Sequence, residues 1–218
     1  MIIKNATFVT SAASPKQFLK PSKPMIAICG KSNVGKSSLI NKLANQRRLA
    51  RTSADPGRTR LVNYFDFGEF LLADLPGYGY AKVSKAEKEK WAKTLEAFFA
   101  QKERLAHVLL LVDIRHDPTD DDEQMVKYLY CNAIPYTVVA TKADKLSRMQ
   151  QGIRADKIAG NLALTRQNIL LTSAETGLGR DALLDKIEQI LQTQALLREN
   201  PEDAESADDT KAGESECG

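Results

Sequence analysis

A glycine-rich loop that contains lysine and serine is the first part of the chain whose residue types could do chemistry. Residues 30–37 read Gly-Lys-Ser-Asn-Val-Gly-Lys-Ser and fit the pattern GxxxxGK[ST]. The backbone N–H groups of such a loop surround a phosphate at the positive end of the helix that follows. We expect Lys36 to reach the β- and γ-phosphates of a nucleotide and Ser37 to give its hydroxyl to Mg²⁺. The predicted phosphate-contacting residues are Gly30, Lys31, Ser32, Asn33, Val34, Gly35, Lys36 and Ser37.

The segments on either side of this loop distinguish a phosphate site from an ordinary turn. Residues 25–29 are short and apolar, as in a buried strand. Residues 36–44 place Leu39, Ile40 and Leu43 on one face of a helix. A strand before the loop and a helix after it are the context that the motif requires, so we interpret residues 30–37 as a phosphate loop.

A second motif follows another predicted strand. Asp74 and Gly77 form the pattern DxxG with Leu75 and Pro76 between them. We expect the Asp74 carboxylate to lie beside Mg²⁺, through a water, and the Gly77 N–H to meet a γ-phosphate oxygen. Many turns satisfy DxxG, so the motif indicates a nucleotide site only because it lies at the end of a buried strand. Loss of the γ-phosphate would release this loop.

A third motif, Thr141-Lys142-Ala143-Asp144, indicates which base is bound. A carboxylate at Asp144 can accept hydrogen bonds from both N1–H and the N2 amino group of guanine, and adenine has no matching donor pair. Sites that pair a buried polar group discriminate by about 10⁴ to 10⁵ against ligands that leave it unpaired. We expect the Lys142 stem to lie over the base. By itself the motif could be a solvated turn.

Residues 172–174, Thr-Ser-Ala, follow the last predicted strand, where small side chains would let backbone N–H groups approach the guanine O6. A plain strand-to-helix loop would have the same letters. The predicted nucleotide-binding set therefore extends to Asp74, Leu75, Pro76, Gly77, Thr141, Lys142, Ala143, Asp144, Thr172, Ser173 and Ala174.

The remaining pattern alternates strands and helices, which indicates a mostly parallel sheet covered by helices on both faces. We predict an α/β fold of the P-loop NTPase type, a three-layer α/β/α arrangement with a six-stranded sheet and one antiparallel strand. Ligands on such sheets bind beyond the carboxyl ends of the strands, where all four motifs fall. The predicted strands are 25–29, 61–67, 70–73, 108–112, 136–140 and 169–171. The later helices are 85–104, after an N-cap at Ser84, and 120–130, 148–164 and 180–197.

Composition and charge are consistent with one globular domain and an acidic tail. The chain has 218 residues, 43% of them hydrophobic, and a net charge of +3. Residues 199–218 hold eight acids and one lysine, which leaves +10 on residues 1–198. We expect residues 1–198 to form a GTPase domain with an N-terminal extension and the tail to be disordered. Without a leader or a membrane-length apolar run, a cytoplasmic location is expected.

The chain resembles the EngB (YihA/YsxC) family of bacterial GTPases among the translation-factor-like P-loop GTPases. The resemblance covers residues from about Phe8 to Leu191 and includes residues 8–12, 30–41, 56–60, 74–81 and 113–116, which read FVTSA, GKSNVGKSSLIN, PGRTR, DLPGYGYA and DIRH. It implies a GTP- and GDP-binding protein that assists assembly of the large ribosomal subunit, and we expect a monomer whose partner is the large subunit or its precursor rRNA. It also implies a requirement in cell division and septation, with no membrane partner.

The resemblance assigns the first switch. It implies that Thr59 completes the Mg²⁺ shell and that Gly57, Arg58, Thr59, Arg60 and Leu61 close over the nucleotide. Lys36, Thr59 and Gly77 would then be the catalytic residues, with Ser37 and Thr59 as metal ligands. From the sequence alone, Thr52 competes with Thr59 for this role. Asn33 resembles the asparagine that helps bind K⁺ in related GTPases, which makes potassium stimulation a hypothesis.

The position after Gly77 holds Tyr78, where Ras-type GTPases have a water-orienting glutamine. We therefore expect slow hydrolysis by the isolated protein, with the missing group supplied by a partner, by K⁺ or by water held on the backbone. Tyr78 and Tyr80 could equally be loop packing or an RNA contact.

Basic residues around the expected first switch suit an RNA partner. Arg47, Arg48, Arg51, Arg58 and Arg60 cluster there, with no acid between Arg47 and Ala54. A septum-associated protein that acts through protein partners is the alternative. A phosphotransferase acting on a small molecule is a third class, but no lid or substrate domain is left over.

Overall fold

The computed structural model describes residues 1–20, 22–51, 61–79, 85–101 and 105–199. Within helix α2 the side chains of residues 85–88, 90 and 91 are not described, and that of residue 199 is not either. The predictions for Thr52, for residues 57–60, for Tyr80 and for the tail from residue 200 onwards therefore lie outside the described residues. No helix in the described ranges has the length and apolarity needed to span a bilayer.

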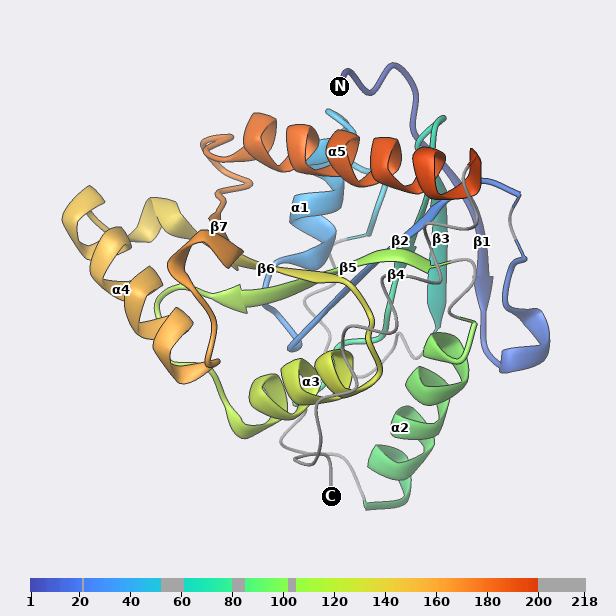
Figure 1. The fold of residues 1–218 in the computed structure, drawn as a ribbon, viewed down its shortest axis with the longest axis horizontal. Coiled ribbons are helices and arrows are strands. Elements are labelled where there is room, and N and C mark those ends of the chain that lie inside the picture. Colours follow the sequence, from blue (N-terminus) through green and yellow to red (C-terminus); the bar gives the residue numbers. More distant parts are fainter. Residues whose placement is uncertain (21, 52–60, 80–84, 102–104, 200–218) are drawn as a thin grey trace.

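A seven-stranded sheet in the order β1-β3-β4-β2-β5-β6-β7 forms the middle of the molecule (Figure 1). The strands are β1 (Thr7–Ala12), β2 (Met25–Gly30), β3 (Val62–Asp66), β4 (Leu71–Asp74), β5 (Leu105–Asp113), β6 (Tyr136–Thr141) and β7 (Ile169–Leu171). Strand β3 is antiparallel to both of its neighbours, and every other pairing is parallel. The expected single antiparallel strand is present.

Strand β1 makes seven strands where six were expected. Its first three residues are exposed and only Ala12 is fully buried. The register shifts between Phe8 and Thr10, which marks a bulge at the sheet edge. The strand forms because it pairs with β3 and because Phe8 packs edge-on against Phe65, at 5.8 Å between ring centroids. A short edge strand with little buried surface gives no clear period of its own, so the apolar pattern did not reveal it.

In the described part of the chain, five helices cover the two faces of the sheet, and three short 3₁₀ turns lie between elements. The helices are α1 (Lys36–Leu43), α2 (Lys85–Phe99), α3 (Asp120–Cys131), α4 (Arg148–Asn161) and α5 (Arg180–Glu199), and the turns are η1 (Pro15–Gln17), η3 (Ala143–Lys145) and η4 (Arg166–Asn168). Helix α2 ends at Phe99, before the expected end near residue 104, and its expected N-cap at residue 84 lies outside the described ranges.

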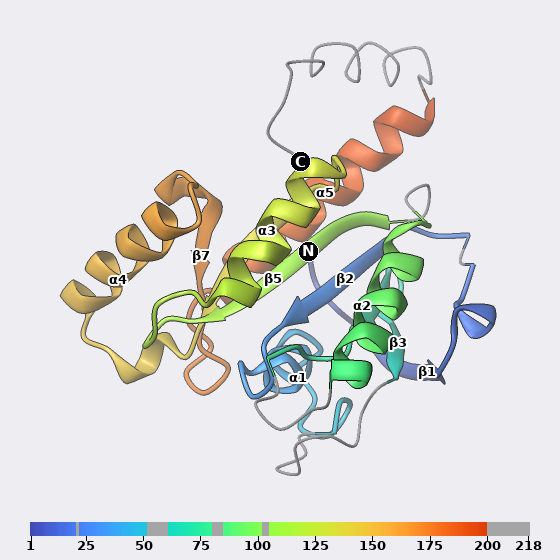
Figure 2. The same cartoon turned by 90° about the horizontal axis from the view of Figure 1, so that it is seen from below.

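The strands alternate their side chains between two hydrophobic cores, which produces the three layers. In β2 all six residues are buried. Met25, Ala27 and Cys29 face the core formed with α2, α3 and α4. Ile26 and Ile28 face the core formed with α1 and α5. Figure 1 shows α5 above β5 and α3 below it, and Figure 2, seen from below, shows α3 in front of α5. The predicted α/β/α arrangement is confirmed, because a strand buried on both faces requires cover on both.

His107 is buried in this sheet and links two strands. Its Nε2 lies 2.9 Å from the Thr137 Oγ1 on β6. Burial, with a smaller contribution from the charge of Lys186, lowers the pKa of His107 to about 4. The histidine is therefore neutral in the folded protein at neutral pH.

This burial predicts an acid-sensitive contribution to stability. As the pH falls from 6.5 to 4, the unfolded chain binds a proton at position 107 that the folded chain does not bind, so folding becomes less favourable. The full effect is about 3 kcal/mol. Urea unfolding at pH 7.5 and pH 4.5 should show wild type losing about 2–3 kcal/mol relative to His107→Gln over that interval. Equal pH dependence in both proteins would contradict the prediction, and contributions from all other groups cancel in the comparison.

Candidate nucleotide-binding site

The predicted motifs meet at one edge of the sheet because each follows a strand of the same direction. The phosphate loop follows β2, the DxxG motif follows β4, the TKAD motif begins at the end of β6 and residues 172–174 follow β7. Since the carboxyl ends of parallel strands lie at a common edge, loops far apart in sequence become neighbours.

Close backbone packing explains the glycines of the phosphate loop. A Cβ on Gly30 would lie 2.6 Å from the Leu111 carbonyl oxygen of β5, so no side chain fits there. Gly35, with φ +111°, is the N-cap of α1, and Asn33 also has a left-handed φ of 62°. The loop thus contains two residues with left-handed backbone and leads into the start of α1, where backbone N–H groups are unpaired within the helix.

The DxxG loop is packed directly on the phosphate loop. A Cβ on Gly77 would lie 3.1 Å from the Lys36 Nζ and 3.2 Å from the Ser32 backbone nitrogen. The Ser32 N–H donates to the Tyr78 carbonyl at 2.9 Å, and the Tyr78 N–H reaches the Gly30 carbonyl at 3.4 Å. Gly77 is thus beside the lysine that we expect at the β- and γ-phosphates, as the prediction requires.

The Tyr78 side chain points away from this loop into the protein. It is 4% exposed, and its hydroxyl donates to the Asp122 Oδ1 at 2.7 Å. The other oxygen of Asp122 accepts from the Thr119 backbone N–H and hydroxyl at the start of α3. Of the two interpretations left open by the sequence, loop packing is therefore the one that the structure supports for Tyr78. The Asp122 contact was missed because it depends on the position of α3.

Asp74 is a buried carboxylate with unused hydrogen-bonding capacity. It is 8% exposed, and its Oδ1 has no partner among the described residues. Burial raises its pKa to about 6, against the charge of Lys36 and a hydrogen bond from Asn63, which both lower it. An anionic oxygen of this kind suits Mg²⁺ or a metal-bound water. Ser37, half-buried in the first turn of α1, supplies a hydroxyl. The described residues hold no cluster of three or more His, Cys, Asp or Glu side chains that could bind a metal without a phosphate.

The TKAD motif is tied to the phosphate loop by two of its side chains. The Thr141 Oγ1 donates to the Val34 carbonyl at 2.7 Å and lies 3.1 Å from the Val112 carbonyl. The Lys142 Nζ donates to the Asn33 carbonyl at 2.7 Å. These contacts join the segment expected to bind the base to the segment expected to bind the phosphates, so the two cannot move independently.

Asp144 is oriented by the loop after β7. Its Oδ1 accepts from the Ser173 hydroxyl at 2.6 Å, and its Oδ2 lies 3.0 Å from the Lys145 Nζ. The Ser173 hydrogen bond, followed by the Lys145 contact, outweighs partial burial and lowers the pKa of Asp144. The carboxylate is therefore ionised and can accept two N–H groups. Ala143 joins the same loops, since its N–H donates to the Thr172 carbonyl at 3.1 Å.

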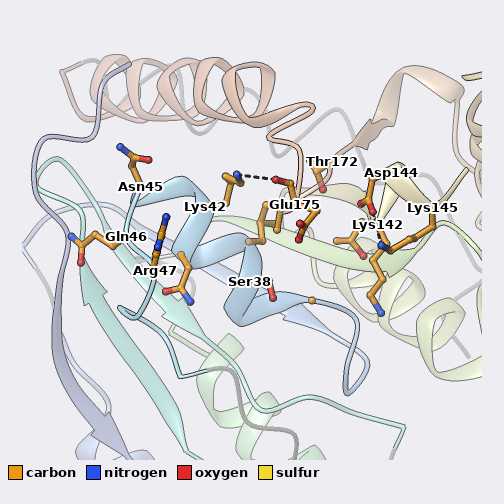
Figure 3. Close-up of a pocket in the computed structure, with 15 residues that line it drawn as sticks. Ser38, Lys42, Asn45, Gln46, Arg47, Lys142, Asp144, Lys145, Thr172 and Glu175 are labelled. Atoms are coloured by element: carbon orange, nitrogen blue, oxygen red, sulfur yellow. Dashed lines mark hydrogen bonds and ion pairs between the residues drawn. The ribbon is translucent and has the colours of Figure 1, made fainter. Parts of the chain in front are cut away.

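A cavity of about 530 Å³ runs between α1 and these loops (Figure 3). Lys142, Asp144 and Lys145 stand at one end, and Asn45, Gln46 and Arg47 stand at the other. Thr141, Thr172 and Ala174 also line it. Its volume lies within the range usual for small-molecule sites. Gly179, in the loop after β7, lies so close to the sheet that a Cβ there would be 1.9 Å from the Leu171 carbonyl oxygen.

The segment that leads to the expected first switch is anchored by a residue to which the sequence assigned no role. Asn41 is 8% exposed, and its side chain makes two hydrogen bonds to the backbone of Ala50. The Asn41 Nδ2 donates to the Ala50 carbonyl at 2.9 Å, and the Asn41 Oδ1 accepts from the Ala50 N–H at 2.7 Å. Arg47, Arg48 and Arg51 around this anchor are exposed. Gly57, Arg58, Thr59 and Arg60 lie outside the described residues, and Leu61 is half-buried immediately before β3. The choice between Thr52 and Thr59 therefore stays open.

Sequence comparisons place the chain among GTP-binding proteins. Residues 25–142 match the family model described as 50S ribosome-binding GTPase. The chain is 48% identical over 191 residues to the probable GTP-binding protein EngB of Desulfitobacterium hafniense strain DSM 10664 / DCB-2, which covers 87% of this chain and 95% of that protein. It is 44% identical over 183 residues to the probable GTP-binding protein EngB of Geobacillus kaustophilus strain HTA426, with 83% and 94% covered.

Solved structures show the same fold. A crystal structure of a probable GTP-binding protein EngB superposes with a TM-score of 0.65 at 22% identity, covering 78% of this chain and 99% of that one. Era, crystallised with MgGDPNP and nucleotides 1506–1542 of 16S ribosomal RNA, superposes with a TM-score of 0.60 at 25% identity, covering 77% and 56%.

Burial of Asp74 predicts a conflict between stability and function at this site. Asp74→Asn should stabilise the nucleotide-free protein at pH 8 by about 1–3 kcal/mol, because the desolvated charge is removed. Asp66→Asn, on the neighbouring strand β3, is the matched control. The Asp66 side chain is 38% exposed and paired with Lys23, so removing its charge should lower the free energy of unfolding by at most about 1 kcal/mol. Urea unfolding without nucleotide measures both. A destabilised Asp74→Asn protein would contradict this account of the carboxylate.

Proposed function

Because the chain belongs to the EngB family of GTP-binding proteins, we propose that it is a guanine-nucleotide switch whose state controls a step in assembly of the large ribosomal subunit. The observation on which this depends is the arrangement around Asp144. A carboxylate kept ionised by Ser173 faces a nucleotide-sized cavity, and the same motif is hydrogen-bonded to the phosphate loop through Thr141 and Lys142. One ligand that combines guanine with phosphates would meet both.

The proposed hydrolytic site uses residues of two loops that are already in contact. Lys36 would bind the β- and γ-phosphates, and the Gly77 N–H would hold a γ-phosphate oxygen. Mg²⁺, when bound, would neutralise charge that develops on the phosphates. Ser37 and Thr59 would hold the ion, and Asp74 would orient a water on it, consistent with its buried and unpartnered oxygen. Gly57 to Leu61 would close over the nucleotide in the GTP state.

Slow hydrolysis by the protein alone is part of the proposal. The Tyr78 side chain donates to Asp122 in the interior, so it does not reach a water beside the γ-phosphate in this conformation. A ribosomal partner, K⁺ near Asn33 or a water held by backbone groups would supply the missing contact. The protein would therefore persist in the GTP state until it meets its activator.

The ribosomal role is supported by family and by charge. The matching family model is described as ribosome-binding, and Era was crystallised with a ribosomal RNA segment. Exposed Arg47, Arg48 and Arg51 beside the first switch suit phosphate contacts that depend on salt. Cell division and septation would require the protein because growth requires large subunits. We also propose that residues 1–198 form the GTPase domain and that residues 199–218 form an acidic tail. The protein would be a monomer and would act in the cytoplasm.

A sedimentation experiment tests the ribosomal role. Protein loaded with a non-hydrolysable GTP analogue should co-sediment with large subunits, and protein loaded with GDP should stay in the supernatant. Binding should weaken as salt is raised, because counterions are released from RNA phosphates. Equal behaviour in both nucleotide states would contradict the switch. Analogue-dependent self-association without subunit binding would favour a septum-associated protein instead.

The base preference is tested at Asp144. Asp144→Asn should weaken GDP binding by about 10²-fold or more, because an amide cannot accept two donors. The same variant should gain affinity for xanthosine diphosphate, whose C2 oxygen accepts from the new amide nitrogen. Titration calorimetry with GDP, ADP and xanthosine diphosphate measures this. Unchanged GDP binding by Asp144→Asn, or tighter binding of ADP than of GDP by wild type, would refute guanine recognition.

A further inference from the structure

Asp113 and Arg115 form an ion pair behind the site, and the nucleotide site described above gives neither a role. Asp113 is the last residue of β5, and Arg115 lies two residues further on. The Arg115 Nε donates to the Asp113 Oδ1 at 2.9 Å, and its Nη2 donates to Oδ2 at 2.7 Å. The Arg115 backbone N–H adds a contact of 3.1 Å to Oδ1. The carboxylate is therefore held in one orientation by a bidentate partner.

The same carboxylate also holds the lysine of the TKAD motif. The Lys142 Nζ lies 2.9 Å from the Asp113 Oδ2 and donates to the Asn33 carbonyl at 2.7 Å. Burial alone would raise the pKa of Asp113, but the hydrogen bonds from Arg115 and Lys142 hold it well below its ordinary value. Asp113 is 14% exposed, so the two cations share a carboxylate that is largely shielded from solvent.

Lys142 lines two cavities. It lines the large cavity next to Asp144 and also a second cavity of about 380 Å³, where Lys31, Asn33, Asp113 and Arg115 lie. Its backbone is left-handed, with φ 60°, which is an uncommon conformation for a residue with a side chain. The ammonium is thus fixed on the side of the second cavity, and the stem is left to face the first.

Two carboxylates lie near this lysine in the folded chain. Asp113 holds the ammonium, and Asp144, two residues after Lys142, is the proposed guanine acceptor. The charge of Asp144 is felt as far as Arg115. If Asp113 were absent, the ammonium would lose its counter-ion. Asp117 in the same cavity is already paired with Arg154 and Lys157, so Asp144, which has a single contact with Lys145, is the carboxylate to which the ammonium could turn. A lysine paired with Asp144 would compete with the base for that carboxylate.

We propose that Asp113, oriented by Arg115, is a positioning residue for guanine recognition: it keeps the Lys142 ammonium against the phosphate loop and away from Asp144. This inference rests on the proposed function, because it concerns the same base site. It assigns a purpose to the first and third residues of the DIRH segment, 113–116. It also makes guanine affinity depend on residues that do not touch the nucleotide.

The test compares GDP affinities by titration calorimetry in the presence of Mg²⁺. Asp113→Ala should bind GDP about 5- to 50-fold more weakly than wild type, and Arg115→Ala about 3- to 10-fold more weakly. These losses are of the size usually measured for the interaction between residues in direct contact. Asp117→Asn is the matched control. Asp117 lines the same cavity but pairs with Arg154 and Lys157, so its change should leave GDP affinity as in wild type.

A double-mutant cycle separates positioning from general damage. In a Lys142→Ala background, adding Asp113→Ala should cause no further loss of GDP affinity, because there is no ammonium to hold. Affinity for inorganic tripolyphosphate, which has no base, should be the same in Asp113→Ala and wild type. Asp113→Asn keeps the shape and removes the charge, so it serves if the alanine variant does not fold.

The outcomes distinguish this inference from the proposed function. Wild-type protein that fails to bind GDP would overturn the proposed function itself. Wild-type binding of GDP with no change in Asp113→Ala, or equal losses with and without Lys142, would overturn only the positioning role. An equal loss of GDP and tripolyphosphate affinity would also overturn it, because the phosphate loop rather than the base site would then be affected.

Discussion

The close approach of the phosphate loop to its neighbours is the constraint on which the rest of this structure depends. Gly30 lies against the Leu111 carbonyl of β5, and Gly77 lies against Lys36 and Ser32. A methyl group on Gly30 would collide with the Leu111 carbonyl, and one on Gly77 would crowd the Lys36 ammonium and the Ser32 backbone. Strand β2 must therefore keep a fixed distance from β5, and the phosphate loop a fixed distance from the DxxG loop. The parallel pairing of β2 with β4 and β5 provides those distances.

This packing explains which features could be predicted from the sequence. The phosphate loop, the DxxG motif and the TKAD motif are local patterns at strand ends, so their shared edge follows once the strands are parallel. The α/β/α layers follow from β2, whose six residues are all apolar or small and need cover on both faces. Here the local pattern and the global arrangement agree, and prediction is safe.

The features that were missed depend on partners far along the chain. Strand β1 gains its stability from β3, fifty or more residues later, and its own first three residues are exposed. Asn41 shows its importance only when Ala50 lies opposite it, and Asp122 only when Tyr78 does. The local sequence around a polar residue in a helix does not indicate which distant residue will be its hydrogen-bond partner. Its role becomes visible only through burial and hydrogen bonds in the folded chain.

Tyr78 connects these observations to the behaviour of a switch. Its backbone is hydrogen-bonded to the phosphate loop, and its hydroxyl is bonded to Asp122, which also caps α3. If a γ-phosphate draws Gly77 to a new position, the adjacent residue must lengthen or break contacts with one of these two partners. The cost of breaking a buried hydrogen bond is about 1–3 kcal/mol, which is comparable to typical allosteric couplings of about 1–3 kcal/mol. In the proposed switch this tyrosine would therefore couple the phosphate to α3, and the slow hydrolysis that we propose would share this structural origin.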